Sequence, residues 1–484
     1  MCGRLTPICS LRVRNMAELL LFHLLFFWKS YTEPFTYSRS ELLSTFYPSW
    51  IHLGRLIRER KSLREDPYYW LNYHAHPVLS SYYPPHCVSA WVSTWLSLDA
   101  SFKLLLWSVT LHHLVASFGW YILLSHVFGP QVALFGALTF TYAGYNIKQQ
   151  PCIVFTITWL PFVLLGLYTQ SHALTSISSA LLILGGYLPL ALYILPTCLL
   201  LALVWHVELF ALGVGVLGAT VCLIPFLKYL PKTIRAHQHD NIGCVPWWHN
   251  FSLVFPRFFR HHVNGVGFWE MSCYVGLIPL LFATLSSSVL AFLGIVTASA
   301  LRSGAYSSYF PRIPARWSFI FQFWLVWASL EGMTSVVLGP GVLTALTLIQ
   351  ALDLYLNNHD LIPTHPYSEL PEKPSRAFNT PLTQFLVNHL GTARVSGLPY
   401  PLFTGHINKL RTLGYSGGMQ LRLMAKWRND TNSNGSGQHD YFVNGKDGTP
   451  LDIARVKYAY TKGRINWPRT CIKYLYRNPR FTTA

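Results

Sequence analysis

Charged residues are scarce in this chain of 484 residues, where Asp, Glu, Lys and Arg together make up only 12%. Soluble proteins carry about 25% charged residues. The deficit excludes a disordered chain or a coiled coil, and it argues against a soluble enzyme. Hydrophobic residues reach 51%, and the mean hydropathy is +0.30. The composition therefore predicts a protein that crosses a membrane several times.

Negative charge is especially rare. The sequence has 19 acidic and 37 basic residues, which gives a formal net charge of +18. In a soluble protein such an excess would indicate nucleic-acid binding. In a membrane protein it predicts loops that face anionic lipid headgroups and a substrate that carries phosphate. We therefore expect membrane lipids as partners and no nucleic acid.

Several enzyme signatures are missing. The chain has no P-loop, no dinucleotide fingerprint, no HExxH and no CxxC, and its nine cysteines are scattered. It therefore signals neither a zinc site nor a redox pair. A G-x-S-x-G pattern occurs at 414–418, and His439 is the only histidine after it. The hydrolase form of this motif needs a strand–turn–helix context and then an acid and a histidine, so we do not expect a hydrolase.

Apolar segments follow one another along most of the chain. The first resembles a signal peptide with arginines upstream, but no A-x-A-like cleavage site follows it. We therefore expect a retained first helix and a cytoplasmic N-terminus. We predict about ten transmembrane helices in all. They are expected near residues 11–31, 102–128, 131–145, 152–168, 174–187, 188–205, 209–229, 275–301, 316–333 and 335–356.

Two loops interrupt these helices. A long first loop covers about 32–101 and is rich in Pro, Tyr, Trp and His, and a second, amphipathic loop covers about 231–274. Together with the helices they form a predicted membrane domain at 1–356. Residues 357–484 are polar, with short alternating stretches that predict strands. The fold class is thus an all-α polytopic membrane domain followed by a small, extracytoplasmic, mixed α/β domain.

The first loop holds carboxylates suited to general-base catalysis. Glu41 precedes one aromatic stretch, and Glu65 and Asp66 precede another. A partly desolvated carboxylate has a raised pKa and accepts a proton well near neutral pH. The alternative is that these acids only pair with neighbouring basic residues. No metal ligands are assigned, although a divalent cation is left open as a cofactor.

Arginines gather in two places. Arg257 and Arg260 lie among aromatic residues of the second loop, and Arg312 and Arg316 lie in a short segment before a predicted helix. A guanidinium donates two parallel hydrogen bonds to a phosphate. The alternative is that the arginines face cytoplasmic lipid headgroups.

A series of short motifs runs through the chain in a fixed order. They are ELLSTFYP at 41–48, PYYWLN at 67–72, YYPP at 82–85, GGYLP at 185–189, IPFL at 224–227, PR at 256–257, YVGLIPL at 274–280, PRIPARW at 311–317, LRTLGY at 410–415, ARVKY at 454–458 and YRNP at 476–479. Their order resembles that of the YfhO-like family of bacterial multi-pass membrane proteins, which belongs to the GT-C superfamily of glycosyltransferases.

The resemblance implies sugar transfer at the outer face of the bacterial cytoplasmic membrane. The donor would be a polyprenyl-phosphate-linked sugar, and the acceptor an envelope glycan, lipid or protein. Glu41 falls where the family has an aspartate that acts as base or orients the donor, with Glu65 and Asp66 as alternatives. The resemblance also implies that Arg312 and Arg316 bind the leaving phosphate. Arg257 and Arg260 are the next candidates for this role.

Two other functions stay open at this point. One is a catalytically inactive scaffold for envelope assembly on the same fold. The other is a flippase or transporter of a lipid-linked intermediate, which should show paired broken helices and charges at mid-bilayer depth.

Overall fold

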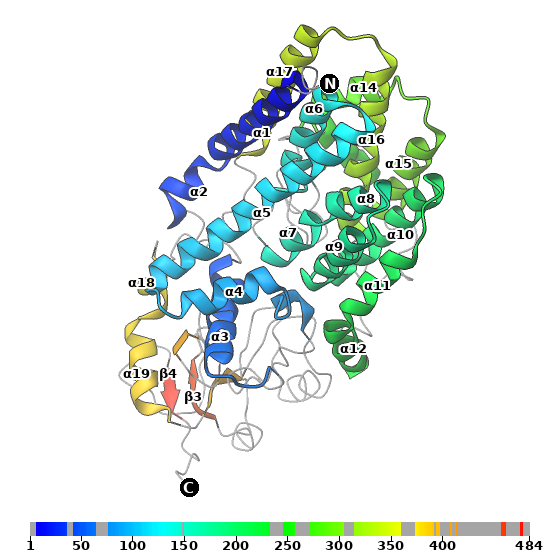
Figure 1. Cartoon of the computed structure of the whole chain (residues 1–484). Helices are drawn as coiled ribbons and strands as arrows, with labels where there is room; N and C mark the ends of the chain where they lie inside the picture. Colours follow the sequence, from blue (N-terminus) through cyan, green and yellow to red (C-terminus); the bar gives the residue numbers. More distant parts are fainter. Residues whose placement is uncertain are drawn as a thin grey trace. The chain divides into compact units, whose positions relative to one another are not determined.

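The structure of the chain is a computed structural model (Figure 1). It describes residues 6–35, 42–63, 76–147, 150–232, 245–256, 272–303, 314–359, 373–391, 394–396, 407–408, 412–413, 456–460 and 475–477. The chain divides into two compact units, each built from three separate segments. Unit 1 comprises Met1–Glu33, Leu106–Thr220 and His239–Pro363, and unit 2 comprises Pro34–Leu105, Val221–Gln238 and Thr364–Ala484.

Unit 1 is a bundle of helices. Its elements are α1 (Thr6–Phe26), α2 (Trp28–Thr32), most of α5 (Leu98–Val127), α6 (Pro130–Tyr142), α7 (Pro151–Thr158), α8 (Leu160–Tyr168), α9 (His172–Leu184), α10 (Leu188–Val204), α11 (Phe210–Gly218), the 3-10 turn η8 (Trp247–Leu253), α14 (Leu277–Ala283), α15 (Val289–Arg302), the 3-10 turn η9 (Pro314–Trp317), α16 (Ser318–Ser335) and α17 (Pro340–Asn358).

Proline and glycine mark where several of these helices begin. Pro130, Pro151 and Pro340 each occupy the first turn of a helix, where the missing N–H costs nothing and the fixed φ suits the helix. Gly129 and Gly276 precede α6 and α14 with φ of 86° and 96°. Glycine alone adopts such angles freely, so the chain can turn sharply into both helices.

Helix α16 lies at the centre of unit 1. Nearly all of its residues are buried, and it packs against α6, α10, α14 and α15. A helix that is apolar on every side is stable only where neighbours surround it. Gly332 lets α14 approach, because a Cβ at this position would overlap the carbonyl oxygen of Phe282.

Helix α17 is joined to α6 by two buried amides. The Gln350 side chain donates to Thr139 Oγ1 at 3.2 Å and to the Val275 carbonyl at 2.7 Å. The Asn358 side chain donates to the Tyr142 carbonyl at 2.8 Å. These bonds satisfy backbone and hydroxyl groups that burial would otherwise leave unpaired, so they fix how α17 lies along α6.

Unit 2 contains shorter elements. They are the π-helical turn η3 (Leu42–Phe46), α3 (Tyr47–Arg58), the 3-10 turn η5 (Pro77–Leu79), α4 (Pro84–Ser93), the start of α5, α12 (Thr220–Tyr229) from its second residue, the 3-10 turn η6 (Leu230–Lys232), α18 (Pro374–Phe378), α19 (Pro381–His389), β1 (Arg394–Ser396), β2 (Thr412–Leu413), β3 (Val456–Tyr460) and β4 (Leu475–Arg477). Helices α3 and α4 pack closely, since a Cβ on Gly54 would overlap the Ala90 carbonyl oxygen.

Hydrogen bonds join the two ends of the sequence within unit 2. The Asp99 carboxylate accepts from the backbone N–H and the hydroxyl of Ser375, both at 2.9 Å. The Arg55 guanidinium donates to the Ile407 carbonyl at 3.1 Å. The ring of Tyr47 packs near that of Phe378, with centroids 6.0 Å apart. The segment predicted as the first loop therefore belongs to the same compact unit as the C-terminal region.

The four strands form one sheet in the order β2-β1-β3-β4. Strand β1 runs parallel to β2 and β3, and β3 runs antiparallel to β4, with Tyr458 opposite Arg477. Most of the chain from 360 to 484 lies outside the described residues. The mixed α/β domain expected at 357–484 therefore stays a prediction.

Each of the ten segments predicted as a transmembrane helix contains α-helix, and the described chain is predominantly α-helical. The segment 209–229 is divided into α11 and α12, which are bent by 65°. The prediction of one helix at 275–301 is wrong, because α14 ends at Ala283 and α15 begins at Val289. The predicted first loop at 32–101 is also corrected, since it contains α3 and α4. Pro48 and Pro84 stand in the first turns of these helices and are the signal that could have indicated them.

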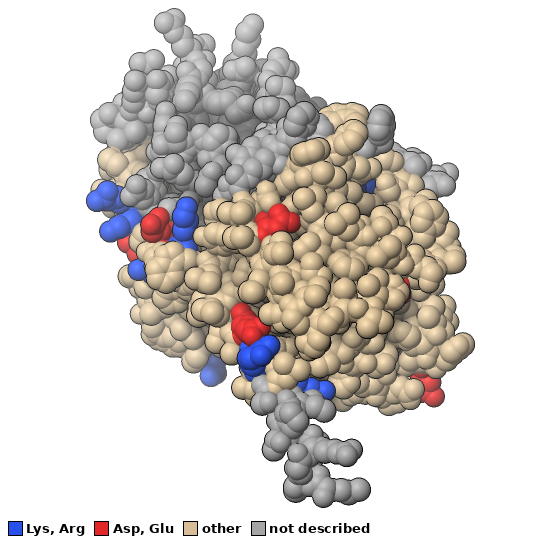
Figure 2. Space-filling model, turned by 90° about the horizontal axis from the view of Figure 1, so that it is seen from above, with Lys and Arg blue, Asp and Glu red and all other residues tan. Residues whose placement is uncertain are grey.

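Within the described residues, Pro151–Tyr168 is the one helical stretch that is long and apolar enough to cross a membrane. The bent pair α11 and α12 makes a second candidate if it counts as one span. The described surface seen in Figure 2 is nearly free of charged side chains. Large apolar side chains such as Leu203, Phe210 and Leu217 are exposed on α10 and α11.

We predict that Gly332→Ala lowers the free energy of unfolding by about 1–3 kcal/mol, because the added methyl group forces α14 and α16 apart. The matched control is Gly341→Ala in the first turn of α17, where nothing lies within 4 Å of the new Cβ. Thermal unfolding of the purified protein checks both, and equal melting temperatures for the two variants would contradict the prediction.

Candidate functional site

Most of the site residues predicted from sequence lie outside the described residues. This applies to Glu41, Glu65, Asp66, Arg257, Arg260 and Arg312. Arg316 is the exception and lies in η9 of unit 1. It is 6% exposed. The geometry of the candidate site is therefore built outward from this arginine.

The Arg316 guanidinium lies over the ring of Tyr187, with its central carbon 4.5 Å from the ring centroid. A cation over an aromatic face is held by the ring quadrupole, and the attraction reaches about 2 kcal/mol where water is excluded. Tyr187 is itself buried. The ring therefore supports one face of a guanidinium whose N–H groups point outward in its plane.

The backbone around Tyr187 explains the GGYLP motif. Gly186 has a φ of 101°, which favours glycine. A Cβ on Gly185 would press on the backbone of Thr156 in α7. The Tyr187 N–H donates to Thr156 Oγ1 at 3.1 Å, and Pro189 follows in the first turn of α10. The two glycines thus let the turn between α9 and α10 lie against α7 and orient the tyrosine.

A second aromatic contact fixes the same junction. Trp317 stacks on Tyr193 of α10, with ring centroids 4.4 Å apart and planes at 23°. Segments 185–189 and 311–317, two of those that carry the resemblance described above, therefore meet where Arg316 lies over Tyr187, and Trp317 adds a contact with α10.

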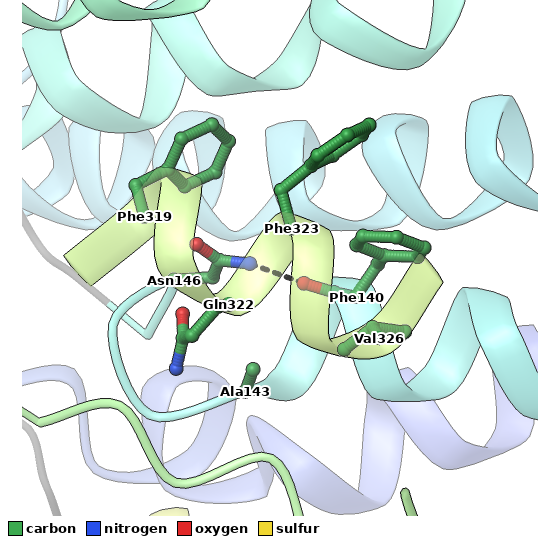
Figure 3. A pocket seen from close by; sticks show the side chains of 7 residues that line it. All are labelled: Phe140, Ala143, Asn146, Phe319, Gln322, Phe323 and Val326. Carbon is green, nitrogen blue, oxygen red and sulfur yellow. Dashed lines mark hydrogen bonds between the residues drawn. The ribbon is translucent and has the colours of Figure 1, made fainter. Parts of the chain in front are cut away.

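One turn further along α16, two side-chain amides face the same small cavity (Figure 3). Asn146 follows α6, and its NH₂ group donates to the Phe140 carbonyl. Gln322 is 2% exposed. Among the described residues neither of its amide atoms has a hydrogen-bond partner, and neither does Asn146 Oδ1. Leaving such a group buried and unpaired costs about 1–3 kcal/mol.

The space between these side chains is narrow, and no point in it is wide enough for a water molecule. Its walls are mostly aromatic. They are formed by Phe140, Ala143, Asn146, Phe319, Gln322, Phe323 and Val326. Water therefore does not satisfy the two amides in this arrangement.

Three described acids lie in predicted membrane helices: Glu18 of α1 pairs with Arg14 at 3.1 Å, and Asp353 and Glu331 accept hydrogen bonds from neutral donors. Tyr274 donates to Asp353 Oδ1 at 2.6 Å, and the Leu277 N–H donates to Asp353 Oδ2 at 3.2 Å. Asp353 thus caps the start of α14. Glu331 accepts from Trp327 Nε1 at 3.0 Å and from the Ser286 hydroxyl at 2.9 Å. These contacts indicate structural roles for Asp353 and Glu331.

A buried polar cluster ties η8 to α15. Arg302 is 1% exposed and donates from its NH1 to the Asn250 side chain at 2.6 Å. The Ser252 hydroxyl lies 3.4 Å from His249 Nδ1 and 3.7 Å from the Cys273 sulfur. Burial, with a smaller contribution from the positive charge of Arg302, lowers the pKa of His249 from 6.5 to about 4. His249 is therefore neutral at physiological pH.

The adjacent histidines of α5 behave as expected of polar groups in an apolar helix. His112 Nδ1 lies 2.6 Å from the Ser108 carbonyl, and His113 stacks on Phe27 at 5.2 Å. Polar side chains in an apolar helix normally face the protein interior, and both histidines are buried there. Within the described part of the chain, no three His, Cys, Asp or Glu side chains are grouped in a way that would hold a metal ion.

Sequence reasoning missed Gln322, Asn146 and Arg302. Gln322 carried a usable signal, because a lone amide in an otherwise apolar helix normally faces the protein interior. The same argument had been applied to His112 and His113. Asn146 and Arg302 directly follow the ends of predicted helices. Polar residues are common at such positions, so neither residue was singled out.

Comparison with known protein families finds no match, and comparison with curated proteins finds none either. The resemblance to YfhO-like proteins therefore stays a prediction that rests on the motifs alone.

We predict that His249 makes stability depend on pH. Its folded pKa lies below its unfolded pKa, so the unfolded chain binds one more proton between about pH 6.5 and 4. This contribution to stability is present above pH 6.5 and is lost as the pH falls. Melting temperatures measured from pH 7.5 to 4.5 should fall more steeply for the wild type than for His249→Gln. Parallel curves would show that His249 does not contribute.

Proposed function

We propose that the protein is an integral membrane glycosyltransferase that moves a sugar from a polyprenyl-phosphate donor to an envelope glycan, lipid or protein. The observation that carries the proposal is the position of Arg316. A buried guanidinium over Tyr187 stands where the GGYLP and PRIPARW segments meet. The tyrosine ring holds one face of the guanidinium, and a guanidinium matches phosphate because it donates two parallel hydrogen bonds to it.

In this mechanism Arg316 stabilises the departing phosphate. The bond between the anomeric carbon of the sugar and the phosphate oxygen breaks as the acceptor oxygen forms the new glycosidic bond. The acceptor proton passes to a carboxylate, for which Glu41 is proposed first and Asp66 and Glu65 next. Negative charge grows on the leaving phosphate, and a positioned cation lowers the energy of that transition state.

The membrane location is part of the proposal. We propose a multi-pass protein of the bacterial cytoplasmic membrane, with a cytoplasmic N-terminus and an extracytoplasmic C-terminal domain. It is supported by the low charge content, by the exposed apolar side chains of α10 and α11, and by the span at Pro151–Tyr168. Unit 2 joins segments 34–105 and 364–484, and placing both on one side requires an even number of spans between them. The proposal is therefore that one of the nine segments predicted there, the interrupted 275–301, does not cross the membrane as a single span.

Glu331 and Asp353 do not favour a transporter, whereas Glu18 lies near the middle of α1 and pairs with Arg14 at 3.1 Å. Glu331 lies four residues from the end of α16 and Asp353 five from the end of α17. At 1.5 Å per residue, both lie within about 8 Å of a helix end. Neither of these two acids therefore supplies the mid-bilayer charge expected of a transporter.

We predict that Arg316→Lys and Arg316→Ala each lower kcat/KM for sugar transfer by about 100-fold or more, because neither restores the two-pronged contact with phosphate. The measurement is transfer of labelled sugar from a panel of polyprenyl-phosphate donors in membranes that contain the protein. Glu41→Ala and Asp66→Ala, in the same assay, identify the base.

The matched control is Arg376→Ala, which removes an exposed arginine of α18 in unit 2. It should leave transfer unchanged. Transfer that survives in both Arg316 variants would contradict the role given to Arg316. Absence of transfer from every donor by the wild-type protein would contradict the enzyme and favour the inactive scaffold.

A further inference from the structure

Helix α4 of unit 2 has one buried face and one exposed face. The buried face consists of His86, Ala90 and Ser93, which recur at helical spacing. The ring N–H of Trp50 in α3 donates to the His86 carbonyl at 3.3 Å. Gly54 of α3 lies so close to the Ala90 carbonyl that a Cβ would overlap it. These contacts fix the rotation of α4 about its own axis, and with it the direction of its other face.

The exposed face of α4, continued by the turn that follows it, is apolar and aromatic. Val88, Trp91 and Trp95 follow one another at helical spacing and are 61%, 43% and 54% exposed. The rings of Trp91 and Trp95 meet edge to face, with centroids 4.3 Å apart. Leu96 is 41% exposed and comes next in the chain. We call these four residues the α4 patch. Single exposed apolar side chains are ordinary, but a contiguous patch with two tryptophans marks an interaction surface.

Positive charge lies at the edge of the α4 patch. Arg58 ends α3 and is exposed, and its guanidinium carbon lies 5.8 Å from the centre of the Trp95 ring. The same guanidinium donates to the Thr94 carbonyl at 3.3 Å. This carbonyl is at the end of α4, where the helix dipole favours a cation. Arg58 is therefore held beside the tryptophans rather than projecting away from them.

Tryptophan beside arginine matches the chemistry of a membrane surface. Indole rings collect at headgroup depth, because one end of the ring is apolar and the other carries an N–H. An amphipathic helix lies in this layer with its apolar face buried, and basic side chains next to it attract anionic headgroups. Glu59 pairs with Lys61, so Arg58 and Arg60 leave the edge of the patch positive. A second copy of the chain carries a net charge of the same sign, +18, so charge complementarity favours anionic lipid.

We propose that the α4 patch binds the surface of an anionic lipid bilayer, an assignment that rests on the proposed membrane location and not on sugar transfer. Trp91 and Trp95 lie at headgroup depth, and Arg58 contacts a lipid phosphate. The helix lies in the plane of the interface, since its ten residues extend only about 15 Å, roughly half the thickness of the hydrocarbon core. Unit 2 thus has a lipid contact of its own.

The test uses the full-length protein labelled with 5-fluorotryptophan in nanodiscs of phosphatidylglycerol and phosphatidylcholine. The chain has 17 tryptophans, so the fluorine NMR signals of Trp91 and Trp95 are assigned with Trp91→Phe and Trp95→Phe. A spin label near the carboxyl end of a lipid acyl chain broadens the signals of nearby fluorines, and a water-soluble gadolinium chelate broadens those in contact with solvent. We expect the lipid label to broaden Trp91 and Trp95 more than the chelate does.

The internal control is Trp50, which belongs to the same unit and is 1% exposed. Its signal, assigned with Trp50→Phe, should be broadened less by the lipid label than the signals of Trp91 and Trp95. Equal broadening of all three signals would show that the label does not distinguish the α4 patch from the interior of unit 2, and it would overturn the proposal.

The role of Arg58 is tested through lipid preference. A spin label on phosphatidylglycerol should broaden Trp91 more than the same label on phosphatidylcholine, because the anionic lipid is enriched at the patch. One basic residue near a membrane surface strengthens this enrichment about fivefold, so Arg58→Gln should lower the preference by that factor. The matched control, Arg376→Gln, removes an exposed arginine of α18 in the same unit and should leave it unchanged. Equal losses in the two variants would overturn the proposal.

The remaining outcomes separate the patch from the proposed function. Broadening by the chelate alone shows a patch that faces water, and broadening by neither reagent shows a patch covered by protein, as in a dimer of this chain. Either result overturns the proposal and leaves the membrane location intact. A protein that does not stay in the nanodiscs overturns both. Lipid contact in a protein that transfers no sugar supports the patch and counts only against the enzyme.

Discussion

The burial of α16 on every side is the constraint on which unit 1 depends. Its neighbours α6, α10, α14 and α15 must surround it, because water would otherwise contact an almost wholly apolar helix. The close approach of α14 to α16 requires Gly332. The turn η9, which leads into α16, places Arg316 over the ring of Tyr187. Gln322, the one amide of this helix, is buried near its start without a hydrogen-bond partner among the described residues.

Hydropathy located the helices well, because long apolar runs stay helical whatever surrounds them. Hydropathy did not locate the points where the chain breaks between helices. The break between α14 and α15 contains three consecutive serines at 286–288, and the Ser288 hydroxyl caps α15 by accepting from the Ala291 N–H. This run of serines was a usable signal in the sequence. Helix α3 has an amphipathic pattern that could have indicated it, whereas the pattern of α4 is weaker. Their stability comes from the close approach at Gly54, which only the fold reveals.

The sequence could predict a site residue only where the residue type and its neighbours in the chain together indicate a function. Arg316 stood out because a guanidinium next to Pro and Trp suits phosphate, yet its partner Tyr187 lies 129 residues away and no local pattern connects them. Gln322 and Asn146 were not predictable as a pair for the same reason. Their significance depends on the absence of partners, which is a property of packing rather than of residue type.

Unit 2 is assembled from three separate chain segments, which affects how it folds during synthesis. Asp99 bonds Ser375 across 276 residues, and Arg55 bonds Ile407 across 352. At about 5–20 residues per second, the ribosome needs roughly 14–55 s to deliver Ser375 after Asp99, using the 276-residue separation. Helices α3 and α4 therefore emerge long before their C-terminal partners. During that interval they depend on each other or on a chaperone, and unit 2 is completed only near the end of synthesis.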